Sequence, residues 1–233
     1  GRTLGYECRS IRLGRCKEFD EEILATDCDQ SALMQLGSPV PEFLALRPGD
    51  KADVWLLEVT KDVAGATGTL HGGCALAAAA VVLETATQRP VSFITGQYLS
   101  RAPVGSTVTI EVEQLAVGNH ITQAAATCFY EGAMILRASA ALGGRDLGVD
   151  MSWVTAPDVP PPAECPPRGT TSETGFSFTD SADIRLAGQQ PGHETVRYWA
   201  RLPGCLASST AGLIALADLL PSGMRVSLDS AFR

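Results

Sequence analysis

The stretch that decides the fold is Thr69-Leu70-His71-Gly72-Gly73 and the alanine-rich segment that follows it as far as Thr87. Alanine favours the helical backbone and has a minimal side chain, so a helix here can lie close against a sheet on nearly all sides. The two glycines lower helix propensity, but they leave the first-turn N–H groups unobstructed for a ligand. The sequence therefore predicts a buried central helix over 70–87 whose start is typical of a binding site.

Strand-like segments flank this helix. Their apolar and polar residues alternate, which is the pattern of half-buried strands. Short turns containing glycine separate the later segments, so we expect consecutive antiparallel neighbours there. The predicted strands cover residues 52–60, 91–101, 106–117, 121–130 and 133–143. One strand, one long helix and a meander predict an α+β domain in which an antiparallel sheet wraps around a central helix.

The segment 147–170 is rich in proline and divides the chain. Proline fixes φ and lacks an N–H donor, so this segment is predicted to be a linker and neither a helix nor an inner strand. The pattern then begins again with two strand-like runs and an apolar helix, over 176–186, 195–202 and 206–220. We therefore predict a first domain over 40–146 and a second domain of the same type over 171–233, which lacks its final strands.

Composition excludes several classes of function. The 233 residues have a formal net charge of −8 and scattered basic residues, which argues against nucleic acid or a membrane as the partner. Seven cysteines are spread singly without a C-x-x-C pair, so we expect reduced thiols, no metal site and a cytoplasmic protein. The most apolar run, Cys74 to Leu83, is too short to span a bilayer. No phosphate loop is present, and we expect no cofactor.

Three motifs, in the order in which they occur along the chain, resemble motifs of the double hot-dog acyl-CoA thioesterases, the type II family. They are Leu70-His71-Gly72-Gly73, the strand Tyr98-Leu99-Ser100-Arg101-Ala102-Pro103 and the strand Tyr198-Trp199-Ala200-Arg201-Leu202-Pro203-Gly204. The resemblance covers most of residues 40 to 222. It implies two hot-dog repeats, each an antiparallel sheet wrapped around a central helix, that act on acyl-CoA. Hot-dog domains pair their sheets edge to edge, so a homo-oligomer is also expected.

The amino-terminal segment 1–36 resembles the closing strands of a hot-dog domain. It is similar in particular to the last strand of the family's second repeat, which carries a catalytic glutamine that here falls on Gln30. We expect this segment either to complete the second repeat of a permuted chain or to close one domain of a longer tandem array.

The helix start has a chemical and a structural interpretation. Backbone N–H groups of Gly72 and Gly73 suit a thioester oxygen, because unpaired donors and the positive end of the helix dipole face the developing charge. The alternative is a tight turn that needs glycine for packing alone. His71 is a candidate contact to the substrate, and the alternative for it is a helix cap or a packed side chain.

The carboxylate that activates water is missing from the first helix. Single-domain relatives place an Asp or Glu where Ala80 stands here, and Glu84 is the only carboxylate on the helix. The first repeat is therefore predicted to be a pocket or scaffold half. The resemblance implies that an Asp, a Ser or Thr and a Gln of the second repeat activate water. Gln30 matches the Gln, and Asp229 is the candidate for the Asp.

No nucleophile motif competes with this interpretation. The sequence has no G-x-S-x-G, and we expect no cysteine to have a histidine beside it that lowers its pKa. We predict an acyl-CoA thioesterase that hydrolyses fatty or other acyl-CoA thioesters. The alternative is a non-catalytic acyl-thioester-binding or scaffold protein, which Ala80 and the unmatched hydroxyl residue favour.

Overall fold

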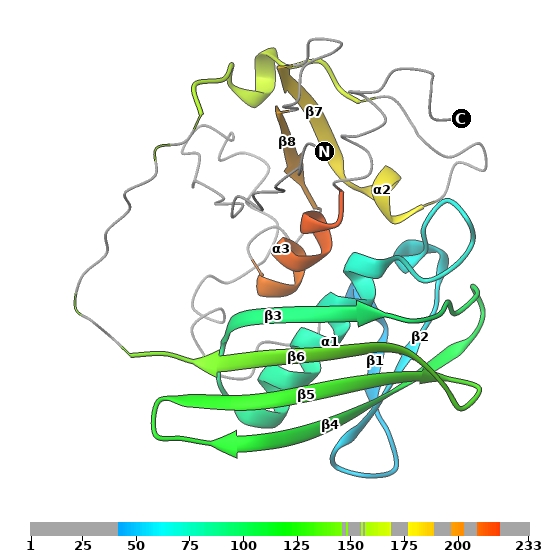
Figure 1. The fold of residues 1–233 in the computed structure, drawn as a ribbon. Helices are drawn as coiled ribbons and strands as arrows, with labels where there is room; N and C mark the ends of the chain where they lie inside the picture. Colours follow the sequence, from blue (N-terminus) through cyan, green and yellow to red (C-terminus); the bar gives the residue numbers. More distant parts are fainter. Residues whose placement is uncertain are drawn as a thin grey trace, which may run out of the picture.

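A computed structural model describes residues 42–145, 148, 155, 157–168, 177–188, 197–202 and 209–219. Within this part of the chain, a six-stranded sheet is curled around α1, a helix from Gly72 to Thr87 (Figure 1). The strands are β1 (Leu46–Pro48), β2 (Val54–Glu58), β3 (Val91–Tyr98), β4 (Thr107–Val117), β5 (Ile121–Tyr130) and β6 (Ala133–Gly143). They are antiparallel in the order β1-β2-β4-β5-β6-β3. The predicted hot-dog architecture is confirmed.

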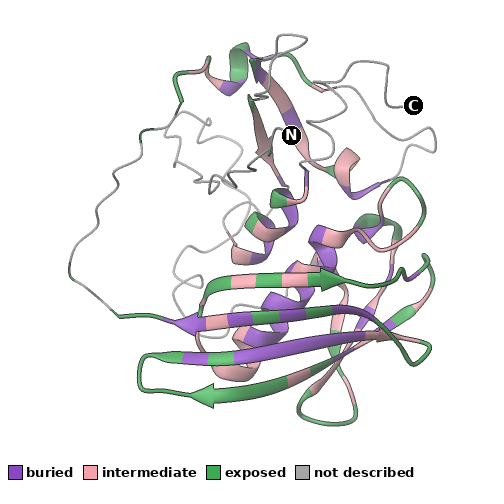
Figure 2. Cartoon of the chain, in the orientation of Figure 1, coloured by how far each residue is buried: buried purple, intermediate pink, exposed green. Residues whose placement is uncertain are grey.

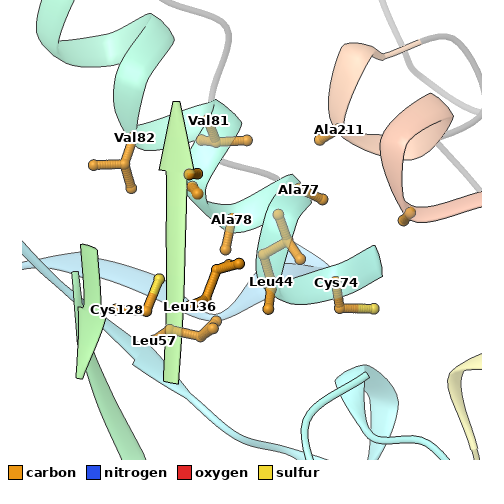
Figure 3. Packing of buried hydrophobic residues seen from close by; sticks show 14 of the residues in the cluster. Leu44, Leu57, Cys74, Ala77, Ala78, Val81, Val82, Cys128, Leu136 and Ala211 are labelled. Atoms are coloured by element: carbon orange, nitrogen blue, oxygen red, sulfur yellow. The ribbon is translucent and has the colours of Figure 1, made fainter. Parts of the chain in front are cut away.

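The core lies between α1 and the sheet. Ala77, Ala78, Ala79 and Ala80 are fully buried, and Figure 2 shows most of α1 in the colour of buried residues. Their small side chains let the helix lie close to the larger residues of the sheet. Figure 3 shows Leu57, Cys128 and Leu136 gathered near Ala78. The prediction of a buried central helix is confirmed.

The meander β4-β5-β6 follows the predicted turns. Between β5 and β6, Glu131 and Gly132 have φ angles of 50° and 78°, the left-handed conformation of a two-residue hairpin turn. Glycine adopts this conformation without steric cost. Between β4 and β5, the Gly118 N–H donates to the carbonyl of Ile121 at 2.9 Å. The turns containing glycine therefore predicted the neighbours correctly from β4 to β6, whereas the turn at Gly105 connects β3 and β4, which are not neighbours in the sheet.

The remaining described residues form a smaller group of elements. β7 (Asp183–Gly188) pairs with β8 (Arg197–Arg201) in an antiparallel fashion, and α3 runs from Thr210 to Ala217. The short helices η3 (Glu42–Leu44), η4 (Lys61–Val63), η5 (Pro162–Glu164) and α2 (Phe178–Ser181) complete the set. The prediction of a strand over 176–186 is thus wrong for the first half of this segment, where α2 forms. The Ser177 hydroxyl donates to Asp180 at 2.8 Å, and such local bonds favour a turn over a strand.

The helices α1 and α3 are packed against each other (Figure 1). Figure 3 shows Ala211 of α3 beside Ala77 of α1, and both are in the buried core. Small residues on both helices permit this close contact. The expected closing strands over 1–36 lie outside the described residues, and so does their relation to the second repeat. Among the described residues, no helix has the length and apolar character needed to cross a membrane.

Candidate functional site

The amino terminus of α1 is the point where four elements meet. α1 begins at Gly72, with His71 in extended conformation as the residue before it. Tyr98 lies at the end of β3, Phe178 begins α2, and Asp218 follows the last residue of α3. The arrangement brings three predicted site residues, His71, Gly72 and Gly73, together with a carboxylate that sequence reasoning missed.

Asp218 is anchored on the helix start. Its Oδ2 atom accepts a hydrogen bond from the Gly73 N–H at 2.8 Å. The first N–H groups of a helix have no intrahelical partner, and the helix dipole favours a negative charge there. The Asp218 side chain keeps 41% of its exposure. One carboxylate oxygen is therefore held in place while water can still reach the group.

The glycine pair makes this close approach possible. A Cβ atom on Gly73 would lie 2.6 Å from the carbonyl oxygen of Ala215, and one on Gly72 would lie 2.8 Å from Asp218 Oδ2. Any other residue would push α3 or its carboxylate away from α1. The Gly73 N–H donates its hydrogen bond to Asp218, so it is not available to bind a ligand. The packing of α3 against α1 thus requires glycine here.

His71 is a tightly held, neutral imidazole. Its ring lies 4.9 Å from that of Phe178 between centroids, and the Phe178 N–H donates to the carbonyl of Ala64 at 2.7 Å. Burial lowers the pKa of His71, and the charge of Asp218 only partly opposes this effect. His71 Nδ1 is 3.7 Å from Asp218 Oδ2, which is too far for a direct hydrogen bond.

Two further groups near Asp218 stay protonated. The Tyr98 hydroxyl donates to the Gly72 carbonyl at 3.0 Å, and burial, with the nearby charge of Asp218, raises the pKa of Tyr98 to about 12. Burial, again with Asp218, raises the pKa of the Cys74 thiol well above its usual range. A protonated, fully buried thiol is a poor nucleophile. These states favour water over a side chain as the attacking group.

The other residues singled out in the sequence lie elsewhere. Ala80 is fully buried in the core, and Glu84 Oε1 accepts a hydrogen bond from the Val91 N–H near the opposite end of α1. Gln30 and Asp229 lie outside the described residues. Within the described ranges, no cluster of three or more His, Cys, Asp or Glu side chains has the arrangement of a metal site.

One sequence signal could have identified Asp218. It is the only charged residue in the apolar segment 206–220, where a helix was predicted. A single charge in an otherwise apolar helix needs a partner or access to water. The sequence does not say which partner, because the Gly73 N–H lies 145 positions away.

Comparison with known proteins agrees with this architecture. Residues 60–143 match the family model described as the acyl-CoA thioesterase N-terminal domain. The match includes all of α1 and the strands β3 to β6. No protein in the curated set matches the chain.

Several solved structures share the wider fold. A candidate thioesterase from Novosphingobium aromaticivorans DSM 12444 is 27% identical, with a TM-score of 0.68 over 78% of this chain and 74% of that chain. The acyl-CoA thioesterase II TesB2 from Mycobacterium marinum is 17% identical, with a TM-score of 0.60 over 83% and 72%. A hot-dog protein of unknown function from Alicyclobacillus acidocaldarius is 20% identical, with a TM-score of 0.65 over 82% and 73%. The resemblance to double hot-dog acyl-CoA thioesterases is therefore confirmed, with residues 60–143 similar to their amino-terminal domain.

Proposed function

We propose that the protein hydrolyses acyl-CoA thioesters at the amino terminus of α1, with Asp218 as the general base. The observation that carries this proposal is the 2.8 Å hydrogen bond from the Gly73 N–H to an Asp218 side chain that stays 41% exposed. A carboxylate fixed in this way can orient a water molecule and accept its proton. The match of residues 60–143 to a thioesterase domain supports thioester hydrolysis as the reaction class.

The reaction proceeds by direct attack of water. Water bound to Asp218 attacks the thioester carbonyl carbon and gives one proton to the carboxylate as the C–O bond forms. The oxyanion is received by the Gly72 N–H, which has no partner within the helix. The C–S bond then breaks, and the CoA thiolate takes the proton back from Asp218. The products are a carboxylic acid and a free thiol, with no covalent enzyme intermediate.

Asp218 takes the role for which the sequence offered Asp229. Two features support Asp218: its bond to the helix start and its place beside His71. Gln30 stays a prediction for a second residue that orients the water, by resemblance to the family. A homo-oligomeric state and a cytoplasmic location also stay predictions from the sequence.

A second candidate function is acyl-thioester binding without turnover. The observation that favours it is Ala80, which leaves the buried length of α1 without an acid. In that case the helix start would hold the thioester, and Asp218 would serve only to join α3 to α1. The two candidates make opposite predictions for an activity measurement.

The test is an assay of the purified protein with CoA thioesters of increasing chain length, in which release of the free thiol is measured. We expect turnover by the wild type and a fall in kcat of about 10²- to 10⁴-fold in Asp218→Asn, which keeps an acceptor for the Gly73 N–H but is no base. Glu84→Gln is the matched control at the other end of the helix and should keep the wild-type rate. Bound thioester without turnover at any chain length would establish the binding function instead.

A further inference from the structure

Phe178 is the largest side chain that is fully buried among the described residues, although it belongs to a helix of only four residues. α2 lies against the segment that leads into α1 (Figure 1), and the Phe178 N–H donates to the carbonyl of Ala64 at 2.7 Å. The Phe178 ring lies 5.8 Å from that of Phe43 and 4.9 Å from that of His71 between centroids. A side chain from the carboxyl-terminal part of the chain is thus packed beside the start of α1.

The backbone just before α1 is fixed by hydrogen bonds. The Leu70 N–H donates to the carbonyl of Ala102 at 2.8 Å, and the His71 N–H donates to that of Val63 at 2.9 Å. The next peptide group, between His71 and Gly72, carries the N–H that receives the oxyanion in the proposed reaction, and this N–H has no partner within the helix. Its direction therefore depends on how firmly the residue before it, His71, is held.

We propose that Phe178 is a positioning residue that fixes the direction of the Gly72 N–H through its contact with the His71 ring. This inference rests on the proposed function. His71 contributes by packing alone: its ring lies against Phe178 on one side, and a Cβ atom on Gly65 would lie 3.7 Å from His71 Cδ2. With the ring held, the peptide group between His71 and Gly72 keeps its orientation as the oxyanion forms. A donor oriented in advance stabilises the transition state without reorganisation.

α2 is itself held from the side away from α1. Arg168 Nη2 donates to the carbonyl of Thr179 at 3.0 Å, and the Ser177 hydroxyl is 2.8 Å from that of Thr179. Local side-chain bonds of this kind keep so short a helix in its conformation. The Phe178 ring is therefore presented by the same part of the chain that supplies Asp218, so that both donor and base depend on how this part packs against α1.

Two substitutions at position 178 remove the ring to different extents. Phe178→Leu keeps most of the volume and loses the aromatic contact, whereas Phe178→Ala leaves a cavity. We expect kcat for acyl-CoA hydrolysis to fall about 10-fold in Phe178→Leu and further in Phe178→Ala, with KM unchanged, because a displaced oxyanion donor affects the transition state alone. Leu142→Val, at a fully buried position of β6 that pairs with Val91, is the matched control and should keep the wild-type kcat.

Hydrogen exchange gives a measurement that does not depend on turnover. The Leu70 and His71 amides are hydrogen-bonded in the wild type, so Phe178→Leu should speed their exchange and Leu142→Val should not. Thermal unfolding checks that each variant is folded, and Phe178→Met replaces any variant at this position that does not fold.

The results separate the role of Phe178 from the function on which it rests. If the wild type turns over and Phe178→Leu, or its substitute, keeps the wild-type kcat, the inference is overturned and the proposed function stands. Equal losses of kcat in Phe178→Leu and Leu142→Val, or unchanged exchange of the Leu70 and His71 amides in Phe178→Leu, also overturn it. A wild type without turnover overturns the proposed function, and amide exchange then still decides whether Phe178 holds the start of α1.

Discussion

The two ends of α1 each hold one carboxylate against a backbone N–H, but the two carboxylates have different origins. Near the carboxyl end, Glu84 of the helix itself accepts from the Val91 N–H at 2.8 Å, across seven positions of sequence. At the amino end, Asp218, the residue that follows α3, accepts from the Gly73 N–H at the same distance, across 145 positions. Local sequence completes one end of the helix, whereas packing of two helices completes the end that carries the candidate chemistry.

The largest expected effect comes from placing a carboxylate within α1 itself. Ala80, the position at which the resemblance to single-domain relatives led us to look for an acid, is fully buried. Ala80→Asp would bury a charge without a partner, so we expect a loss of more than about 3 kcal/mol in the free energy of unfolding. Urea unfolding measures this loss. Ala86→Asp, at a half-buried position of the same helix, is the control and should lose much less; equal losses would contradict the description of Ala80.

The next effect tests the close approach of α3 at the amino end. A Cβ on Gly73 would meet the Ala215 carbonyl oxygen at 2.6 Å, so Gly73→Ala must separate α3 from α1. We expect a loss of about 1–3 kcal/mol in the free energy of unfolding, together with loss of thioester hydrolysis. Gly144→Ala is the matched control, because a Cβ there meets no atom within 4 Å. A fully active and stable Gly73→Ala variant would show that the contact is dispensable.

A smaller effect compares the two carboxylates directly. Asp218→Ala and Glu84→Ala each remove one hydrogen bond to a backbone N–H, and each should lower the free energy of unfolding by about 0.5–1.5 kcal/mol. Only Asp218→Ala should abolish turnover. Chemical unfolding and thiol release, measured on the same preparations, separate the two effects. Similar activity losses in both variants would remove the distinction between the ends of α1.

The smallest expected effect is a pH dependence of stability from His71. Burial lowers the pKa of His71 below its ordinary 6.5, against the opposing charge of Asp218. The unfolded chain therefore binds a proton more readily, so the free energy of unfolding falls as the pH drops below about 6.5 and through the folded-state pKa.

This pH effect is isolated by comparing the wild type with His71→Phe. The titratable group that acts on His71 is Asp218, which follows α3 and whose charge also acts on Cys74 of α1 and Tyr98 of β3, and all three are retained in the variant. Urea unfolding at a series of pH values should give a shallower decline for His71→Phe between about pH 7 and about pH 5. Identical declines would mean that His71 is not buried in its neutral form.

Much of the first repeat could be predicted because its signals are local. The alanine content of 72–87 indicates a buried helix, and the turn at Glu131-Gly132 indicates that β5 and β6 are neighbours. Residues 178–181 were less predictable. Their apolar and polar pattern suits a strand, and the side-chain bonds of Ser177 that favour a turn become visible only in three dimensions.

The sequence by itself determined the hot-dog fold, the helix start at His71-Gly72-Gly73 and the absence of an acid at Ala80. These features depend on residue type and spacing along a short stretch of chain. Only the tertiary structure decided that the Asp218 carboxylate lies on the Gly73 N–H, with His71 Nδ1 3.7 Å from it. The physical reason is that both contacts depend on how closely α3 can approach α1. That distance is set by the glycines of α1 and the backbone of α3, and it cannot be predicted from a local sequence pattern.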